Sequence, residues 1–188
     1  MYLATTPEAN DLLANDPLAL LIGMLLDQQI PMEKAFTSPA VLCERLGGTM
    51  DAQQIATYDP EQFELIFRTP PALHRFPAAM AKRVQELGRI LAERYDGDAA
   101  AVWTGATSGA DVVKRVAALP GFGEQKAKIF TALLGKQYDL SVRGWRQASG
   151  DFGAKGSHRS VADVVDAASL QKVRGYKQQM KAAAKAAD

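Results

Sequence analysis

The chain has 188 residues, of which 47% are hydrophobic and 23% are charged, and its formal net charge is +1. This length supports one substantial hydrophobic core, or two lobes that share one. The sequence has no apolar run of about 18 residues and no signal-peptide pattern at its start, so we expect a cytoplasmic protein without a membrane span. The single cysteine, Cys43, excludes an internal disulfide and a four-cysteine zinc or iron–sulfur site, and we therefore expect no metal cofactor.

The charges are divided unevenly along the chain. Residues 1–110 contain 8 Lys and Arg against 14 Asp and Glu, a net charge of −6, whereas residues 111–188 contain 14 against 7, a net charge of +7. This asymmetry indicates that one face of the protein binds a polyanion, and nucleic acid is the class we favour. The alternative is that both sets of charges only keep the surface solvated.

Apolar residues recur at helical spacing, and no segment shows the alternation of a β-strand, so we expect an all-α fold. Proline, glycine and capping residues set the helix ends, and Ser38-Pro39 can interrupt the predicted helix 33–46. No linker or repeat divides the chain, which predicts one domain over residues 1–188. The predicted helices are 17–29, 33–46, 51–57, 60–67, 77–95, 99–103, 111–118, a helix after Gly123 that ends near 135, 142–148, 160–165 and 169–186.

The string Leu-Pro-Gly-Phe-Gly-Glu-Gln-Lys-Ala connects two of these helices. Gly121 and Gly123 allow the backbone to turn and to approach a ligand, and the N–H groups that open the second helix have no partner within it. With the helix dipole behind them, and with Lys126 and Lys128 nearby, these donors suit a phosphate group. Phe122 is expected to point inward and hold the hairpin. The simpler alternative is an ordinary helix connection without a ligand.

This string and the apolar helix after it resemble the helix-hairpin-helix of the HhH-GPD superfamily of base-excision DNA glycosylases. The resemblance covers residues from about 17 to 150 and is specific at the hairpin, residues 111–136. It implies a two-lobed helical DNA glycosylase fold with a DNA cleft between the lobes, and DNA binding. We further expect double-stranded or branched DNA as the partner, a monomer, and association with the nucleoid. The resemblance also implies a monovalent cation at the hairpin. The iron–sulfur cluster of some relatives is not expected, because the cysteines for it are missing.

Paired glutamines follow the first apolar helix. Gln28 and Gln29 resemble the family segment whose side chain enters the DNA stack, where a long amide fills the gap beside a displaced base. The alternative is that they cap a buried helix end. The segment 68–76 contains tandem prolines and is expected to be a loop. Family members have a DNA-facing loop at this place, so Arg68, His74 and Arg75 are candidates for contacts with the DNA backbone. His74 alone fits a polar surface or capping residue better than a catalyst.

The family's catalytic Asp lies about twenty residues after the second hairpin glycine, where it stabilises positive charge on the sugar as the base leaves. In this chain that position is Arg143, and Arg146 nearby is a further candidate for DNA contact. The nucleophilic lysine of bifunctional relatives falls on Gln125, which we include among the DNA-binding residues. Asp139 is a weak substitute for the missing carboxylate, and Asp151 lies beyond it in the chain.

The last predicted helix, 169–186, is basic and weakly apolar. It is either a solvated surface element or a second contact with phosphates, and we favour the contact because such a helix gains little from packing. Its positive residues are Lys172, Arg174, Lys177, Lys181 and Lys185, opposed by Asp188 alone.

Three functional hypotheses follow from these features. The first is a DNA-binding protein that recognises damaged, distorted or branched DNA through phosphate contacts, without standard glycosylase or lyase activity. The second is a monofunctional DNA glycosylase that excises cationic or labile alkylated bases, and the third is a helical protein-interaction module. We favour the first, whereas a carboxylate in the cleft between the hairpin and the glutamine pair would favour the enzyme. The aromatic candidates for lining a pocket are Trp103, Tyr138, Trp145 and Phe152.

Overall fold

The computed structural model describes residues 1–187, and Asp188 lies outside the described residues. This part of the chain contains helices and no β-strand, which confirms the all-α prediction. None of its helices is by itself long and apolar enough to cross a membrane, and α1 and α2 meet that test only as a pair bent by 114°. In chain order the elements are α1 (Pro7–Asn15), α2 (Pro17–Leu26), α3 (Met32–Arg45), α4 (Ala52–Thr57), α5 (Pro60–Arg68), α6 (Pro77–Tyr95), α7 (Ala101–Thr104), α8 (Gly109–Ala117), α9 (Glu124–Gln137), α10 (Trp145–Ala148), the 3-10 turns η1 (Gly150–Gly153) and η2 (Val161–Asp163), and α11 (Ala167–Ala187).

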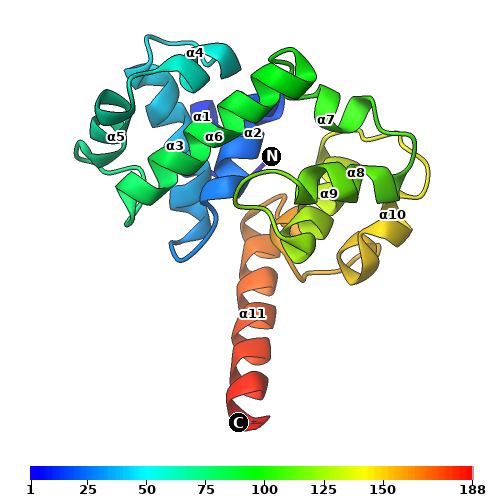
Figure 1. The fold of residues 1–188 in the computed structure, drawn as a ribbon. Coiled ribbons are helices and arrows are strands. Elements are labelled where there is room, and N and C mark those ends of the chain that lie inside the picture. The colour runs from blue at the N-terminus through cyan, green and yellow to red at the C-terminus, as the bar shows by residue number, and fades with distance from the viewer. Residues whose placement is uncertain (188) are drawn as a thin grey trace.

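The helices form two lobes, and α11 projects from the region between them (Figure 1). In the first lobe α2 packs against α1 and α3, and α6 packs against α4 and α5. In the second lobe α9 is central and contacts α8, α10 and both 3-10 turns. The lobes meet where the C-terminal end of α2 contacts the first turn of α9.

Helix α2 forms the centre of the first lobe. Every residue from Leu18 to Leu26 is buried, and full burial of each large apolar side chain contributes roughly 1.5–3 kcal/mol. Asp16 caps the helix by accepting from the backbone N–H groups of Leu18 (2.8 Å) and Ala19 (3.1 Å). The helix ends at Leu26 instead of the predicted residue 29, because Asp27 leaves helical geometry and the side chains of Gln28 and Lys126 bind carbonyl groups of the last turn.

Aromatic contacts hold the second lobe together. Trp103 lies edge-on to Phe130, with ring centroids 5.8 Å apart, and to Tyr138 at 6.1 Å. Phe122 of the hairpin packs against Phe130 at 5.9 Å and is only 6% exposed, so it points inward as predicted. These contacts fix the hairpin on α9.

Two glycines admit the segment that follows α9. A Cβ atom on Gly135 would lie 2.3 Å from the Trp145 ring, and one on Gly109 would lie 2.4 Å from the Trp145 Cα atom. The chain therefore packs across α8 and α9 at this point. Gly144, with φ +80°, precedes α10, which begins at Trp145 and not at the predicted residue 142.

Two other helix predictions were wrong. The expected interruption of α3 does not occur, and Ser38 beside Pro39 donates hydrogen bonds to the carbonyl oxygens of Lys34 (2.8 Å) and Leu73 (2.8 Å). The predicted helix 160–165 is only the short turn η2, which a capping box at its first residues stabilises.

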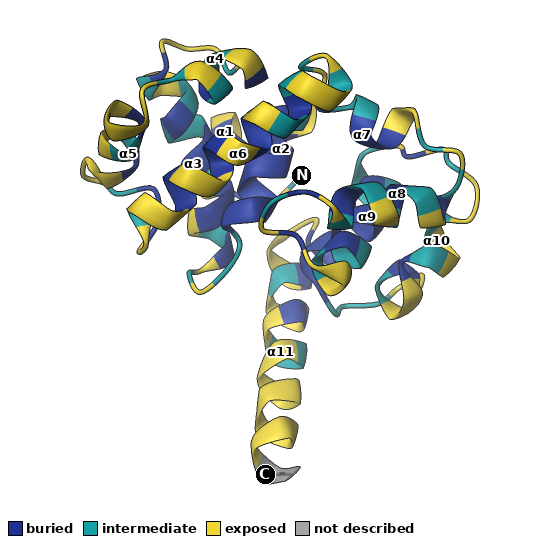
Figure 2. Ribbon diagram, viewed as in Figure 1, coloured by how far each residue is buried: buried dark blue, intermediate teal, exposed yellow. Residues whose placement is uncertain are grey.

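Helix α11 is packed only near its beginning. Val173 is 2% exposed, and Leu170 packs against the core. From residue 177 to residue 185 every side chain is exposed, as Figure 2 shows. The helix contains the whole of the predicted segment 169–186, and its second half extends from the body of the protein.

Candidate nucleic-acid interface

The hairpin presents the start of α9 to open space. Gly121 has φ +77°, where other residues are strained, and a Cβ atom on it would lie 3.3 Å from Leu25 Cγ. Around Gly123 no described atom lies within 4 Å of the place its Cβ would take, and no described side chain caps the first turn of α9. The backbone N–H groups of that turn are therefore free to bind an anion.

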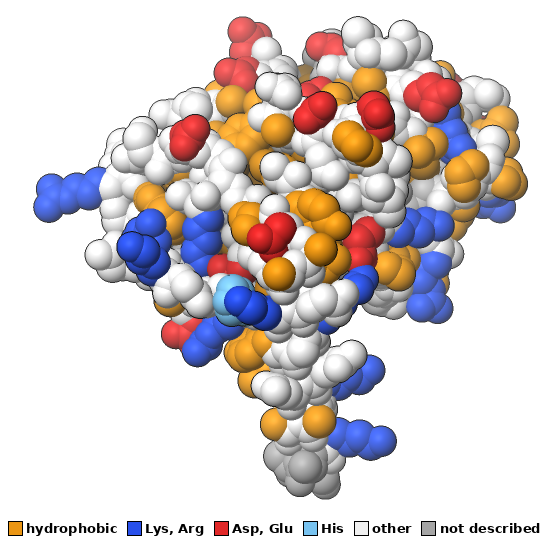
Figure 3. All heavy atoms as spheres, turned by 180° about the vertical axis from the view of Figure 1, so that it is seen from behind, with side chains coloured by type: hydrophobic (Ala, Val, Ile, Leu, Met, Phe, Trp, Pro, Cys, Tyr) orange, Lys and Arg blue, Asp and Glu red, His pale blue; other side chains and the backbone are white. Residues whose placement is uncertain are grey.

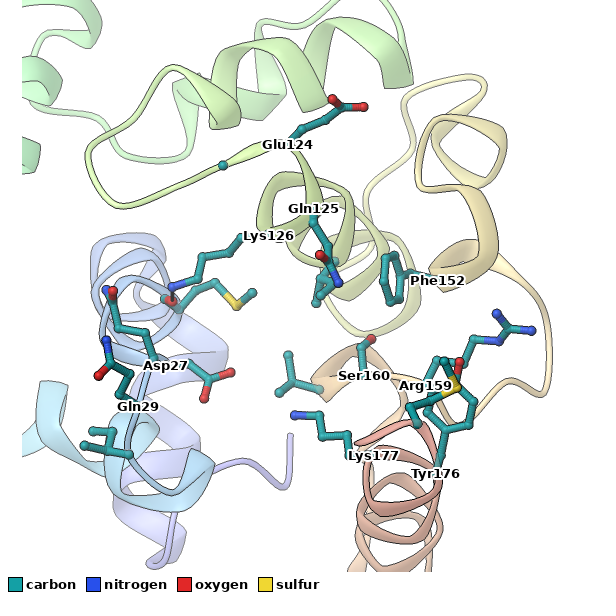
Figure 4. Close-up of a pocket in the computed structure, with 17 residues that line it drawn as sticks. Asp27, Gln29, Glu124, Gln125, Lys126, Phe152, Arg159, Ser160, Tyr176 and Lys177 are labelled. Atoms are coloured by element: carbon teal, nitrogen blue, oxygen red, sulfur yellow. Dashed lines mark hydrogen bonds between the residues drawn. The ribbon is translucent and has the colours of Figure 1, made fainter. Parts of the chain in front are cut away.

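A cavity of about 850 Å³ lies beside the hairpin (Figure 4). Four separate parts of the chain form its walls: the turn after α2, the start of α9, the segment from η1 to η2, and α11. The glutamine pair and the hairpin therefore line the same cavity. The lining residues are Met24, 27–30, 123–126, Ile129, Phe152, 159–161, Tyr176, Lys177 and Met180.

Asp27 places a carboxylate in this cavity. It directly follows α2, and its side chain points across the cavity toward Lys177 in Figure 4. Burial raises the pKa of this carboxyl group above its ordinary value, while the positive charges of Lys177 and Lys126 act in the opposite direction. A desolvated carboxylate stabilises a nearby positive charge more strongly than one in water does.

The ammonium group of Lys126 connects the two lobes. Its Nζ atom donates to the carbonyl oxygens of Met24 (2.9 Å) and Leu25 (3.1 Å) at the end of α2. Burial lowers the pKa of Lys126 to about 8, although the negative charge of Asp27 raises it. The side chain predicted to contact a phosphate is therefore directed at the cavity wall and is engaged by protein carbonyls.

The other polar residues of the hairpin helix differ in their surroundings. Gln125 lines the cavity, and in Figure 4 its amide points into it. Lys128 forms an ion pair with Glu124 (2.6 Å), which lowers the pKa of that carboxyl group. Gln125 is thus a hairpin side chain that can contact a ligand in the cavity.

One of the four aromatic candidates lines the cavity. Phe152 does so, whereas Trp103, Tyr138 and Trp145 pack within the second lobe. Tyr176 of α11 provides a second aromatic wall. Sequence reasoning did not single it out, because the part of α11 around it showed only a basic pattern.

The two glutamines have different environments. Gln28 Nε2 donates to the Leu25 carbonyl (2.7 Å), and its Oε1 accepts from Arg83 Nη1 (3.0 Å). Gln29 has φ +57°, is exposed and lines the cavity. Gln28 therefore makes the contacts of a helix cap, and Gln29 stays a candidate for insertion into DNA.

His74 is buried, so the predictions that it contacts the DNA backbone or lies on the surface were wrong, whereas its hydrogen bonds to backbone groups fit the alternative of a capping residue. It is 1% exposed, and its Nδ1 atom accepts from the Phe76 N–H (3.1 Å), which leaves Nε2–H to donate to the Gln28 carbonyl (2.9 Å). Burial lowers the pKa of the ring, and the neutral imidazole joins the loop to the glutamine turn. Arg68 and Arg75 are exposed.

The residues at and near the catalytic position that was counted from Gly123 do not reach the cavity. At about 1.5 Å per residue, the far end of α9 lies roughly 20 Å from Gly123. Asp139 follows that end with φ +52° and an exposed side chain, and Arg143 is exposed beyond it. Arg146 stacks on Trp145, 4.3 Å from the ring centroid. None of these three polar residues is among the described residues that line the cavity, which corrects the placement of Arg143 at the catalytic position.

The chain returns to the cavity later than the count assumed, because α10 intervenes. Phe152 of η1 is the first described residue after α9 that lines the cavity, and Arg159 and Ser160 follow it. The nearby carboxylate of Asp163 forms an ion pair with Lys136 (2.6 Å) and is 9% exposed, and Asp151 pairs with Arg159. The return segment therefore presents a hydroxyl group to the cavity where the family resemblance led us to expect a carboxylate.

The uneven charge along the sequence is also uneven in space. On the face shown in Figure 3, Asp and Glu gather toward the top, and Lys and Arg lie mostly in the lower part and along α11. Among residues 1–187 no group of three His, Cys, Asp or Glu side chains is placed to hold a metal ion. A monovalent cation at the hairpin stays a prediction.

Two helical lobes with a glycine hairpin beside a cavity define a helix-hairpin-helix protein of the DNA-binding class. A family model described as HhH-GPD superfamily base excision DNA repair protein matches residues 22–187. The chain therefore belongs to the HhH-GPD superfamily of base excision DNA repair proteins. Comparisons with curated proteins and with solved structures found no match.

Proposed function

We propose that the protein is a monofunctional DNA glycosylase that removes a base from an extruded nucleotide, with Asp27 as the carboxylate that stabilises the sugar. The observation that carries this proposal is the place of Asp27, whose carboxylate faces the cavity beside the hairpin. A carboxylate in this cleft is the feature that separates the enzyme hypothesis from DNA binding without chemistry.

The hairpin supplies a DNA contact that does not depend on sequence. The free N–H groups at the start of α9, together with the helix dipole, bind a phosphate of the strand that carries the lesion. Gln29 at the cavity is placed to fill the gap that an extruded nucleotide leaves. The cavity of about 850 Å³ is in the size range of small-molecule sites, and Phe152 and Tyr176 offer aromatic surfaces to the base.

The reaction needs an anion near the sugar. As the bond from C1′ to the base breaks, its electron pair leaves with the base, and the positive charge that develops on the sugar is stabilised by Asp27. Water then adds to C1′ and gives its proton to Asp27, which yields an abasic site and a free base. The amine of Lys126 donates to the end of α2, which favours hydrolysis over a covalent lyase step.

The charges around Asp27 favour a base that leaves easily. Lys126 and Lys177 partly offset the negative charge of Asp27, so the cavity stabilises a cationic sugar less than an isolated carboxylate would. Purines alkylated at N3 or N7 carry a positive charge that is neutralised as they leave, and their glycosidic bond is already weak. We therefore propose them as the substrate class, ahead of uracil, 8-oxoguanine or thymine glycol.

Single-turnover release of the base tests this function. With enzyme in excess over duplexes that carry an N-alkylated purine, uracil, 8-oxoguanine or thymine glycol, we expect release of the alkylated purine. Asp27→Asn should slow release by on the order of 100-fold or more while the duplex is still bound. Asp139→Asn, which changes an exposed carboxylate at the far end of α9, is the matched control and should leave the rate unchanged. Equal rates for wild type and Asp27→Asn would exclude the assigned role of Asp27.

Recognition of damaged or branched DNA without excision is the second candidate function. It is favoured by the return segment, where Ser160 and no carboxylate faces the cavity, and by Gln125 at the place of the family's nucleophilic lysine. This function predicts tighter binding to abasic or branched duplexes than to intact DNA, with no base released from any duplex of the panel. Single-turnover base release and the affinity for each duplex therefore decide between the two candidate functions.

A further inference from the structure

The projecting half of α11 carries a row of positive charge. Lys177, Lys181 and Lys185 follow one another at intervals of four residues, so they lie along one side of the helix at steps of about 6 Å. All three are exposed, and α11 contains no Asp or Glu. Among the described residues neither Lys181 nor Lys185 has an ion-pair partner, whereas Arg174 in the packed half pairs with Glu33.

The row begins at the cavity and continues away from it. Lys177 lines the cavity, with its side chain directed toward Asp27 in Figure 4. From Lys177 to Lys185 the helix extends by about 12 Å, beyond the two lobes (Figure 1). Positive charge is thus continuous from the site of the proposed extruded nucleotide to a point outside the body of the protein.

We infer that residues 177–185 of α11 form an arm that binds the phosphate backbone of DNA on one side only of the nucleotide held in the cavity. This inference rests on the proposed function, because that function places the nucleotide. At 3.4 Å per nucleotide of one strand, an arm of about 12 Å covers roughly three to four nucleotides. The contact is electrostatic and therefore independent of sequence.

The composition of the arm fits a nucleic-acid backbone better than a protein or a membrane surface. Met180 is its one large apolar residue, and the other residues are Gln, Lys and Ala, so the arm has no apolar face to bury. Ala, Lys and Gln are strong helix formers, but so short a helix is marginal in water without a partner. A row of phosphates would supply that partner by pairing with the lysines.

Duplexes with unequal flanks test the direction of the arm. A non-cleavable abasic analogue is placed in a long duplex and in two shortened duplexes, each truncated to about two base pairs on one side of the analogue. For the wild-type protein we expect fluorescence anisotropy to show a loss of affinity of about tenfold when one particular flank is shortened, and a much smaller loss for the other. A smaller salt dependence should accompany the sensitive truncation.

Charge reversal then assigns the asymmetry to the arm. Lys181→Glu with Lys185→Glu should weaken binding to the long duplex by about tenfold, remove the difference between the two truncated duplexes, and make the logarithmic salt dependence shallower by about 1.8, which is roughly 0.9 for each lost contact. The matched control is Lys114→Glu with Lys155→Glu, two exposed lysines of the second lobe, which should keep the asymmetry. Ala183→Pro, which breaks the arm helix without changing its charge, should also abolish the asymmetry.

The outcomes separate the arm from the proposed function. If both truncations weaken wild-type binding equally, or if the arm and control pairs have equal effects, the arm inference is overturned while lesion binding stands. If the abasic duplex binds no better than an intact one, the site in the cavity fails. In that case, weaker binding of intact duplex by the Lys181→Glu, Lys185→Glu variant would show that the arm is a general DNA contact. The inference that the arm binds on one side of the nucleotide would then be overturned.

Discussion

Asp27 and Lys126 carry charges in the cavity that burial disfavours. Burial raises the pKa of the Asp27 carboxyl group and lowers the pKa of the Lys126 ammonium group to about 8. Opposite shifts of neighbouring groups concentrate at functional sites, because desolvated charges seldom improve stability. The role of Asp27 could not be predicted from the sequence, since nothing local to the turn after α2 indicates that it faces a hairpin about a hundred residues later.

Replacing Asp27 by Asn should stabilise the protein while it removes activity. A carboxyl group whose pKa is raised in the folded state holds its proton more tightly there than in the unfolded chain. Stability therefore falls as the pH rises from 3.8, the ordinary value, to the raised folded pKa, and the loss persists at neutral pH. Urea denaturation at pH 4 to 8 should show a higher midpoint for Asp27→Asn at neutral pH, with the difference shrinking toward pH 4. An equal or lower midpoint at pH 7 would mean that Asp27 supports the fold.

Elements with local signals could be predicted, and those with distant partners could not. Helix α6 occupies the predicted residues 77–95, because Pro77 opens it and Asp96 in the left-handed conformation ends it beside Gly97. Helix α2 ends early because Lys126, a hundred residues away in the chain, binds its last carbonyl groups. Helix α10 begins late because Gly144 and the packing of the segment on α9 decide its start.

The turn after α2 should separate into a structural and a DNA-binding glutamine. Gln28→Ala loses the hydrogen bonds to Leu25 and Arg83 and should lower the stability by about 1 kcal/mol, with similar affinity changes for intact and abasic duplexes. Gln29→Ala, in an exposed position at the cavity, should leave the melting temperature unchanged and reduce only the preference for abasic DNA. The reverse pattern, with Gln28→Ala as the selective variant, would mean that Gln28 and not Gln29 is the DNA-binding residue of the pair.

The phosphate contact of the hairpin should contribute equally to the binding of every duplex. Gly123 has open space around it and a negative φ of −97°, so Gly123→Glu should preserve the fold while it places a negative charge at the phosphate site. We expect its affinity for intact and damaged duplexes to fall by a similar factor of about tenfold, with a salt dependence shallower by about 0.9. Gly123→Gln, of equal size and without charge, is the control and should retain most of the affinity. Unchanged affinity of the folded Glu variant would exclude a phosphate contact at the hairpin.

At the scale of the whole molecule, the cavity is a product of topology. The hydrophobic pattern and the hairpin motif are properties of short segments, so fold class and family could be predicted. The cavity combines four segments, and its membership depends on where the chain returns after α9. The count that placed Arg143 there failed because α10 lengthens the return, which brings Phe152, Arg159 and Ser160 to the cavity. In the proposed function, Asp27 on the opposite wall of the cavity provides the carboxylate that stabilises positive charge on the sugar.

The free energy of unfolding should rise in mild alkali, because of Lys126 at the contact between the lobes. Lys126 in the second lobe donates to Met24 and Leu25 in the first, and its pKa is about 8 when folded against an ordinary value of 10.5. Between these values the unfolded chain binds a proton that the folded protein does not, so the free energy of unfolding rises with pH. The neutral amine still has two N–H groups for the two carbonyl oxygens, and the contact survives deprotonation.

Lys126→Met should remove this rise. Urea denaturation from pH 7 to 10 should show the stability of the wild type increasing relative to the Lys126→Met variant, by up to on the order of 3 kcal/mol. Other titrating groups are common to both proteins and cancel in the difference. Lys128→Met, which changes the lysine paired with Glu124 on the same helix, is the control and should follow the wild-type curve. Parallel curves for wild type and Lys126→Met would mean that Lys126 titrates at its ordinary pH and that solvent reaches the contact between the lobes.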